Sequence, residues 1–276
     1  MRSLQTLFKA LLVLNIALFL PAVAANELRL ATTTSLENSG LLAYLLPEFE
    51  QQCTCHVRVI PVGTGKALAL GKRGDVDVLL VHAPAAEQQF IADGYGSARQ
   101  PIAYNYFILL APPTDPAAAA ASGNILNALK NISEQQLLFL SRGDDSGTHK
   151  KELALWQRLA QQQNRPINYD RNWYIEAGVG MGQAIIIAEE LGAYVISDTG
   201  TYLHLRDKVT LQPLELPPSD LLYNPYSVIR INPQRHPHVN SALAKQFSDW
   251  LATPQTRQRI ANYRLFGESL FTPIEN

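Results

Sequence analysis

Residues 141–151 carry the side chains in this sequence that are best suited to hold an anion. They read Ser-Arg-Gly-Asp-Asp-Ser-Gly-Thr-His-Lys-Lys, between an apolar run at 137–140 and a helical pattern that begins near Lys151. This order predicts a strand, a tight polar turn and the start of a helix. A helix start offers unpaired N–H groups and the positive end of the helix dipole, and Arg142 adds a permanent cation. We therefore expect this turn to bind an anion.

Three other polar turns follow predicted strands in the same way. They are Thr33-Thr34-Ser35, Gly63-Thr64-Gly65 and Gly178-Val179-Gly180. In open α/β sheets, ligands bind where the strand ends meet the helix N-termini. Hydroxyls and backbone N–H groups donate hydrogen bonds without bringing full charge. A site made of such donors and one arginine fits a fully deprotonated tetrahedral dianion, which presents only acceptors.

Each turn also has a plainer interpretation. The first is compatible with a simple helix cap and the second with an ordinary turn, while the third lacks the lysine of a nucleotide-binding loop. Asp144 and Asp145 argue against a simple anion site. Either carboxylate can orient Arg142 by an ion pair or cap the helix. If one of them instead reached the ligand, it would accept a hydrogen bond from a protonated oxyanion such as phosphate.

A hydrolase is the competing enzymatic interpretation, because Ser146 lies close to His149 in the sequence. A nucleophile elbow needs Gly-x-Ser-x-Gly, and the spacing here differs. We expect His149 to be solvated, and His82 to lie at a strand end near the cleft in a structural role. The His, Cys and carboxylate residues show no metal-site spacing. We therefore predict no enzyme activity, no metal and no cofactor; an adhesin or structural module also ranks low because the sequence has no repeat.

Strands and helices alternate along the chain, which predicts an α/β fold with a parallel sheet. Strands are expected at 27–34, 57–62, 76–81, 106–110, 136–140, 169–174, 193–197, 209–216 and 226–231. Helices are expected at 41–52, 66–72, 85–92, 125–130, 152–163, 184–191, 238–252 and 254–263. These elements form two modules of similar size, and the last helices should return to the first module. The pattern is that of a binding protein with two lobes, a hinge and a ligand cleft between the lobes.

The first 25 residues have the order of a secretory signal. Arg2 and Lys9 are followed by an apolar stretch at 11–20, and then by a small-residue cleavage site near Ala24-Ala25. An uncleaved anchor is the alternative. The remaining chain has 21 basic and 24 acidic residues, a formal charge of −3. This balance, without a basic cluster, argues against nucleic acid as a partner.

Cys53 and Cys55 are separated by one residue. A disulfide across so short a span would be strained, and His56 alone is too little to complete a metal site. We expect two free thiols at a helix-to-strand turn, with a disulfide clip between them as the alternative.

Six segments resemble the tungstate-binding receptors of bacterial ABC importers, which are type II periplasmic binding proteins. They are residues 30–42, 62–68, 77–83, 141–152, 180–182 and 194–202. The likeness extends over nearly the whole exported chain, and the block 141–152 is its most specific part. More distantly, the pattern is similar to molybdate and phosphate receptors. The chain departs from the expected pattern at Cys53, at Cys55 and in the alanine run 117–121, all away from the inferred site.

The resemblance implies a site, a division of the chain and a set of partners. Tungstate would be the ligand and molybdate its near competitor, with a phosphate or other oxyanion receptor as the alternative function and a serine hydrolase as a remote one. Lobe 1 would comprise 26–107 and 229–276, and lobe 2 would comprise 108–228. The partner would be a membrane permease with a cytoplasmic ATPase, and the receptor a periplasmic monomer. Carried over by position, the donors would be Thr33, Ser35, Thr64, Arg142, Ser146, Gly147, Thr148 and the backbone N–H of Val179.

Overall fold

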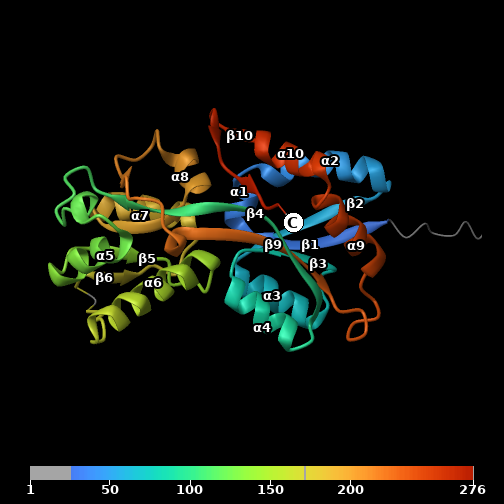
Figure 1. The fold of residues 1–276 in the computed structure, drawn as a ribbon, viewed down its shortest axis with the longest axis horizontal. Helices are drawn as coiled ribbons and strands as arrows, with labels where there is room; N and C mark the ends of the chain where they lie inside the picture. Colours follow the sequence, from blue (N-terminus) through green and yellow to red (C-terminus); the bar gives the residue numbers. More distant parts are fainter. Residues whose placement is uncertain (1–25, 171, 276) are drawn as a thin grey trace, which may run out of the picture.

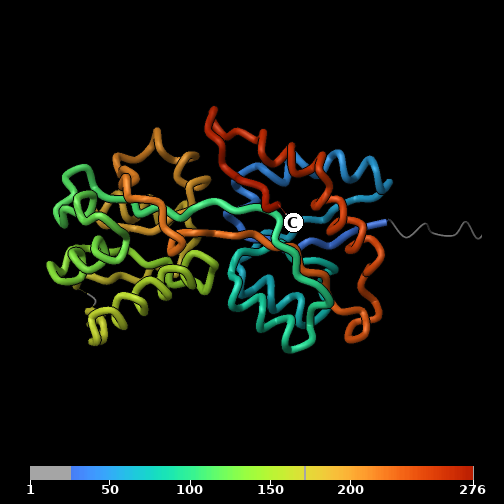
Figure 2. Tube along the Cα trace, viewed as in Figure 1, coloured from blue at the N-terminus to red at the C-terminus, as the bar shows by residue number. Residues whose placement is uncertain are grey.

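The chain folds into two α/β lobes that lie side by side (Figure 1). This is a computed structural model, and it describes residues 26–170 and 172–275. The predicted signal peptide, 1–25, lies outside the described residues. Figure 2 shows that the chain passes between the lobes along two extended segments near the middle of the molecule. The predicted two-lobed arrangement is confirmed.

Lobe 1 is built on three parallel strands: β1 (Glu27–Thr33), β2 (His56–Val62) and β3 (Val78–Val81). Leucines recur at helical spacing through 41–49, and they bury one face of a helix against these strands. The helices of this lobe are α1 (Thr34–Asn38), α2 (Leu41–Cys53), α3 (Thr64–Arg73), α4 (Pro84–Ala92), α9 (Ser241–Leu251) and α10 (Pro254–Asn262). Phe247 of α9 packs on Phe49 of α2, with ring centroids 5.0 Å apart. The C-terminal helices therefore return to the first lobe, as predicted.

Lobe 2 is built on β5 (Phe139–Ser141), β6 (Tyr174–Glu176) and β7 (Tyr194–Asp198). Both β6 and β7 run parallel to β5, which lies between them. The helices of this lobe are α5 (Ile125–Glu134), α6 (Gly147–Gln163), α7 (Met181–Leu191) and α8 (Thr199–Leu205), with a short 3-10 turn η1 (Ala120–Ser122). In Figure 1, α5 and α6 cover one side of these strands and α7 and α8 the other.

Two long strands join the lobes: β4 (Gly96–Ala111) and β9 (Tyr223–Ile231). They pair with each other in antiparallel fashion, and the full strand order is β2-β1-β3-β9-β4-β7-β5-β6. Because β9 is also antiparallel to β3, and β4 to β7, the sheet is mixed. The prediction of a parallel sheet was therefore wrong for the central strands, although it holds for the outer strands of each lobe.

Buried apolar side chains form separate clusters on the two faces of each lobe. The lobe 1 clusters draw on α2, α9 and α10 on one face and on α3 and α4 on the other. The lobe 2 clusters are centred on Trp156 and Phe139 on one face and on Ile185 and Val195 on the other. Each lobe thus has its own core. The boundaries at 107/108 and 228/229 stay a prediction.

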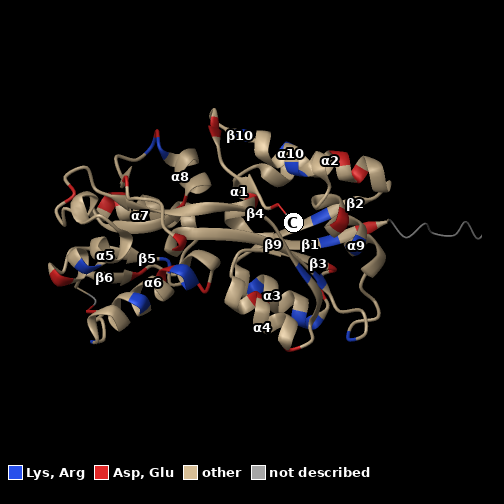
Figure 3. Ribbon diagram, viewed as in Figure 1, with Lys and Arg blue, Asp and Glu red and all other residues tan. Residues whose placement is uncertain are grey.

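The remaining elements are short. They are β8 (Gln212–Pro213), the 3-10 turn η2 (Asp220–Leu222), β10 (Arg264–Leu265), β11 (Glu268–Ser269) and β12 (Thr272–Pro273). Of the strand predicted at 209–216, only the two residues of β8 are a strand in the structure. Basic and acidic residues are interspersed along the ribbon of both lobes (Figure 3). Among the described residues, every helix is too short or too polar to cross a bilayer.

Cys53 and Cys55 form a disulfide, so the prediction of two free thiols was wrong. Helix α2 ends at Cys53, and Thr54 adopts a left-handed conformation with φ of 49°. This turn brings the two Cα atoms to 5.1 Å, which lies within the range that a disulfide spans. The disulfide therefore links the end of α2 covalently to the residue that precedes β2.

Candidate anion site

The lobe 1 half of the candidate site is formed where neighbouring strands end. Thr33 ends β1 and pairs in register with Val62 of β2, so the turns that follow the two strands lie next to each other. The hydroxyl of Thr33 accepts a hydrogen bond from the Leu36 N–H at 3.3 Å and lies 3.3 Å from the Ser35 hydroxyl. Thr64 begins α3, directly after β2. All three predicted donors of this lobe, Thr33, Ser35 and Thr64, are buried.

The lobe 2 half is centred on Arg142, which follows β5 and is 3% exposed. Its Nη2 donates to Asp144 Oδ2 at 2.5 Å, and its Nη1 donates to the Thr148 hydroxyl at 3.3 Å. Asp144 Oδ1 accepts from the Ser146 N–H at 3.2 Å. Each oxygen of Asp144 therefore already holds a donor of the turn, and this carboxylate orients Arg142, which is one of the two roles that we considered for it.

Helix α6 begins inside this turn. Ser146 is its N-cap, and the Ser146 hydroxyl accepts from the His149 N–H at 3.1 Å, which leaves its own O–H able to donate elsewhere. The N–H groups of Gly147 and Thr148 lie in the first turn, where a helix supplies no partners. All three residues are buried. The helix is 17 residues long, so its dipole adds positive potential at this end.

Val179 lies beside Arg142, on the turn after β6. Strands β5 and β6 are parallel, with Ser141 paired to Glu176, so their following turns meet. The backbone N–H of Val179 donates to the Arg142 carbonyl at 3.3 Å. In this arrangement the Val179 N–H holds the arginine turn in place. Its predicted role as a direct donor to the ligand stays a prediction.

The two halves meet across the junction of the lobes. A Cβ atom added at Gly63 would lie 3.8 Å from the Ser146 Cα, and one added at Gly147 would lie 2.6 Å from Cε1 of His82. Gly63 and His82 belong to lobe 1, whereas Ser146 and Gly147 belong to lobe 2. The Cβ at Gly63 would make an ordinary van der Waals contact, whereas the Cβ at Gly147 would clash with the His82 ring, so Gly147 is the position where the approach of the lobes requires a glycine.

His82 lies at the end of β3, at the junction of the lobes, and it is buried. Its Nδ1 is 2.7 Å from Asn224 Oδ1, and its ring stacks on Tyr226 with centroids 4.9 Å apart. Burial lowers the pKa of His82 to about 4, against the smaller opposing effects of the Asn224 hydrogen bond and the Asp198 charge; the charges of Arg142 and Lys151 act in the same direction as burial. The ring is therefore neutral at physiological pH, and its contacts fit the structural role that we expected.

Two buried polar atoms of the predicted donors have no hydrogen-bond partner among the described residues. They are the Thr64 hydroxyl oxygen in lobe 1 and Nε of Arg142 in lobe 2. Leaving such a group unpaired costs about 1–3 kcal/mol. Unpaired donors on both sides of a lobe junction are the arrangement that an acceptor-only ligand would complete.

Comparison with known proteins agrees with this architecture. The family model described as a PBP superfamily domain matches residues 21–255. The chain belongs to the PBP superfamily. It is 44% identical over 254 residues to the tungstate-binding protein TupA of Peptoclostridium acidaminophilum, covering 91% of this chain and 86% of that protein.

Two solved structures of PBP-superfamily proteins are similar along most of this chain. The tungstate ABC transporter structure from Geobacter sulfurreducens has a TM-score of 0.77 at 42% identity, covering 86% of this chain and 98% of that one. The tungstate-binding protein TupA from Desulfovibrio alaskensis G20 has a TM-score of 0.76 at 40% identity, covering 91% of this chain and 100% of that one. Both relations support a common two-lobed fold.

Glu152 lies on α6, one turn beyond Thr148. Its carboxyl is buried and accepts a hydrogen bond from the Tyr174 hydroxyl on β6 at 2.6 Å. Burial raises the pKa of Glu152 to about 7, while Tyr174 and the Arg142 main chain act in the opposite direction. Glu152 thus joins α6 to the strand beside the arginine turn. Sequence reasoning missed this role, because a glutamate inside a helix usually faces solvent.

His149 is half-buried, so the prediction of a solvated side chain was wrong. Its Nδ1 accepts a hydrogen bond from the Asp145 N–H at 3.1 Å. Asp145 itself is exposed, adopts φ of 58° and pairs with Lys150. The left-handed turn at Asp145 folds its N–H back onto the histidine ring. His149 therefore supports the turn through its Nδ1, which is occupied by the Asp145 N–H.

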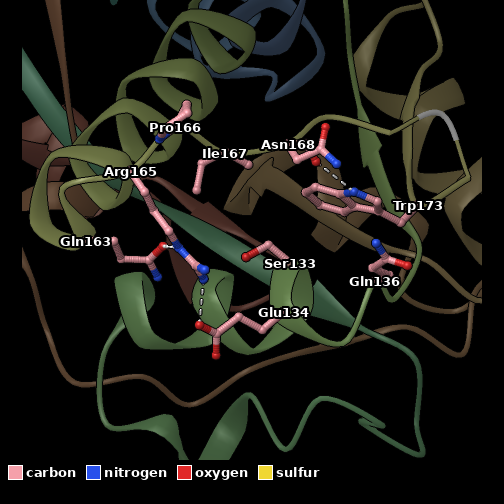
Figure 4. A pocket seen from close by; sticks show the side chains of 9 residues that line it. All are labelled: Ser133, Glu134, Gln136, Gln163, Arg165, Pro166, Ile167, Asn168 and Trp173. Atoms are coloured by element: carbon pink, nitrogen blue, oxygen red, sulfur yellow. Dashed lines mark hydrogen bonds and ion pairs between the residues drawn. The ribbon is translucent and has the colours of Figure 1, made fainter.

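A cavity lies away from these residues, between the end of α5 and the segment after α6 (Figure 4). It has a volume of about 450 Å³. Figure 4 shows Arg165 reaching Glu134, 2.9 Å away, and Trp173 Nε1 donating to the Asn168 carbonyl at 3.0 Å. Arg165 and Glu134 therefore satisfy each other, whereas the buried Nε2 of Gln163, which also lines this cavity, has no partner among the described residues.

Proposed function

We propose that this protein is an extracytoplasmic solute-binding receptor that captures tungstate for an ABC importer, with molybdate as the near competitor. The observation that carries the proposal is the set of buried donors on both sides of the lobe junction, among which the Thr64 hydroxyl and Nε of Arg142 are unpaired. The relatives named for tungstate binding, at 40–44% identity, support the choice of anion.

The donor set favours a tetrahedral dianion over a protonated anion. Arg142, the hydroxyls and the α6 N–H groups all donate, and each oxygen of Asp144 is already engaged. A hydrogen bond to a charged group contributes about 1.5–3 kcal/mol, so five would contribute roughly 8–15 kcal/mol before the cost of association. Tight capture therefore requires neither a metal nor a covalent bond.

Residues 1–25 would direct export and be removed near Ala24-Ala25, so that the mature chain works in the periplasm as a monomer. Anion binding would favour the closed arrangement of the lobes, because only there do donors of both lobes reach one ligand. The closed receptor would then deliver the anion to a membrane permease with a cytoplasmic ATPase, without performing chemistry on it.

Calorimetric titration of the mature chain with tungstate, molybdate, sulfate and phosphate tests the proposal. We expect tungstate and molybdate to bind much more tightly than sulfate or phosphate. Binding of phosphate alone would replace the tungstate assignment with a phosphate receptor. No heat and no thermal stabilisation with any of the four anions would refute an oxyanion receptor altogether.

A further inference from the structure

Lys151 makes contacts that the anion site itself does not explain. It lies on α6, one turn beyond Gly147, whose N–H is a predicted anion donor. Its ammonium donates to the backbone carbonyls of Leu221 at 3.1 Å and Tyr223 at 2.9 Å, and it lies 5.7 Å from the centre of the Phe107 ring. One side chain thus connects the anion-binding helix to three residues outside it.

Those residues belong to the connection between the lobes. Tyr223 is the first residue of β9, Phe107 lies in β4, and Leu221 is in the 3-10 turn that leads into β9. Tyr223 pairs in register with Tyr106 of β4, so the two strands are already joined at this level. Lys151 therefore fixes α6 against both of the strands that continue into lobe 1.

The ammonium is held in a largely apolar setting. Burial lowers the pKa of Lys151, and among the described residues no carboxylate acts on it in the opposite direction. Its charge is felt by His82, on the lobe 1 side of the junction. Without an acidic partner, the buried ammonium is stabilised by its hydrogen bonds to the two carbonyls. A neutral apolar side chain of similar length would not make these hydrogen bonds.

We propose that Lys151 is a positioning residue of the anion site. It aligns the first turn of α6 with the lobe 1 donors by holding the helix against β4 and β9, the two strands that join the lobes (the hinge strands). This inference rests on the proposed function. The Lys151 ammonium, which is outside the predicted donor set, would then contribute to the anion affinity, because a small rotation of α6 moves the donors of Ser146, Gly147 and Thr148 together. Hydrogen bonds weaken steeply when their distance or angle is wrong.

The alternative is that Lys151 only stabilises lobe 2. In that case its removal would lower the unfolding temperature of the ligand-free protein and leave tungstate affinity unchanged. Substitution by arginine separates the two roles further, because a guanidinium can donate to both carbonyls and so restore alignment.

The test compares Lys151→Met, Lys151→Arg and the control Lys245→Met, which removes an exposed ammonium on α9 that pairs with Asp249. By tungstate calorimetry we expect Lys151→Met to bind at least about tenfold more weakly than the unmodified chain, with the other two variants within about threefold of it. Lys151→Gln, whose amide can reach one carbonyl, should be intermediate, and it replaces the methionine variant if that one does not fold.

Two results overturn the inference. If the unmodified chain binds tungstate and Lys151→Met, or Lys151→Gln in its place, binds within about twofold of it, Lys151 is structural and the proposed function stands. If arginine fails to restore the affinity of a folded protein, the carbonyl contacts are not the cause. Failure of the unmodified chain to bind any oxyanion would instead remove the proposed function, and this inference with it.

Discussion

Replacing Gly147 by alanine should weaken anion binding without lowering the stability of the ligand-free fold. A Cβ atom at this position would lie 2.6 Å from Cε1, 2.8 Å from Nε2 and 3.0 Å from Nδ1 of His82. The histidine ring has little freedom to yield, because Asn224 holds its Nδ1 at 2.7 Å and Tyr226 stacks against its face. The substitution therefore places an atom where the two lobes touch.

The size of the effect follows from the distance. The contact must lengthen by about 0.8 Å to reach the 3.4 Å of an ordinary van der Waals contact. If the lobes stop short by that amount, a hydrogen bond of about 2.9 Å from lobe 1 to the anion stretches beyond its useful range. Losing one hydrogen bond to a charged ligand costs about 1.5–3 kcal/mol, or roughly 10- to 150-fold in affinity.

Calorimetry with tungstate and thermal unfolding without ligand measure the two sides of this prediction. We expect weaker binding but no fall in the ligand-free unfolding temperature, since alanine is a better helix former than glycine. Gly182→Ala is the matched control, because its Cβ would lie 3.8 Å from Leu205 and 4.0 Å from Thr201 in the first turn of α7. Tungstate affinity equal to that of the unmodified chain in Gly147→Ala would refute the reasoning.

Three further predictions follow from other contacts. Arg142→Lys keeps the charge but cannot reach Asp144, Thr148 and an anion together, so calorimetry should show tungstate affinity about 10- to 100-fold lower; unchanged affinity would remove Arg142 from the site. The folded state raises the pKa of Glu152 from 4.5 to about 7, so the stabilisation by its neutral carboxyl is complete below pH 4.5 and is lost as pH rises to 7. The free energy of unfolding, measured with urea, should therefore decrease between these pH values by up to about 3 kcal/mol more in the unmodified chain than in Glu152→Gln. An identical pH dependence in the two proteins would contradict the assignment. Replacing Cys53 and Cys55 by serine should cost about 1–2 kcal/mol, because the closed loop is short, and should leave tungstate affinity unchanged; an altered affinity would link the bridge to the site.

The parts of the fold that the sequence predicted are those that depend on local pattern. The short β-branched apolar run at 78–81 indicates a buried strand by its length and composition, and the leucines of 41–49 indicate a helix by their periodicity. Strand direction has no such signature, so the antiparallel insertion of β9 between β3 and β4 was not predicted. The first half of β4 was missed because Pro101 reads as a strand breaker, and the structure accommodates it with a register shift between Pro101 and Ala103.

The candidate site shows the same division between local and distant information. Arg142, Ser146 and Thr148 could be located from one polar turn between a strand and a helix, and the structure brings them together. Lys151 and Asn224 could not, because their partners lie about 70 and 140 residues away in the sequence. Their side chains act through the junction of the hinge strands, which exists only after the two lobes have assembled.

Asp144 explains how a site with one arginine can favour a dianion without an excess of positive charge. Its carboxylate lies 2.5 Å from Arg142 Nη2 and balances that charge, so the turn offers directed N–H and O–H groups more than net charge. Its other oxygen accepts the Ser146 N–H, so both oxygens of the carboxylate hold donors of the same turn. Under the proposed function, discrimination between anions of equal charge would depend on distances across the junction, where the His82 ring leaves no room for a Cβ atom at Gly147.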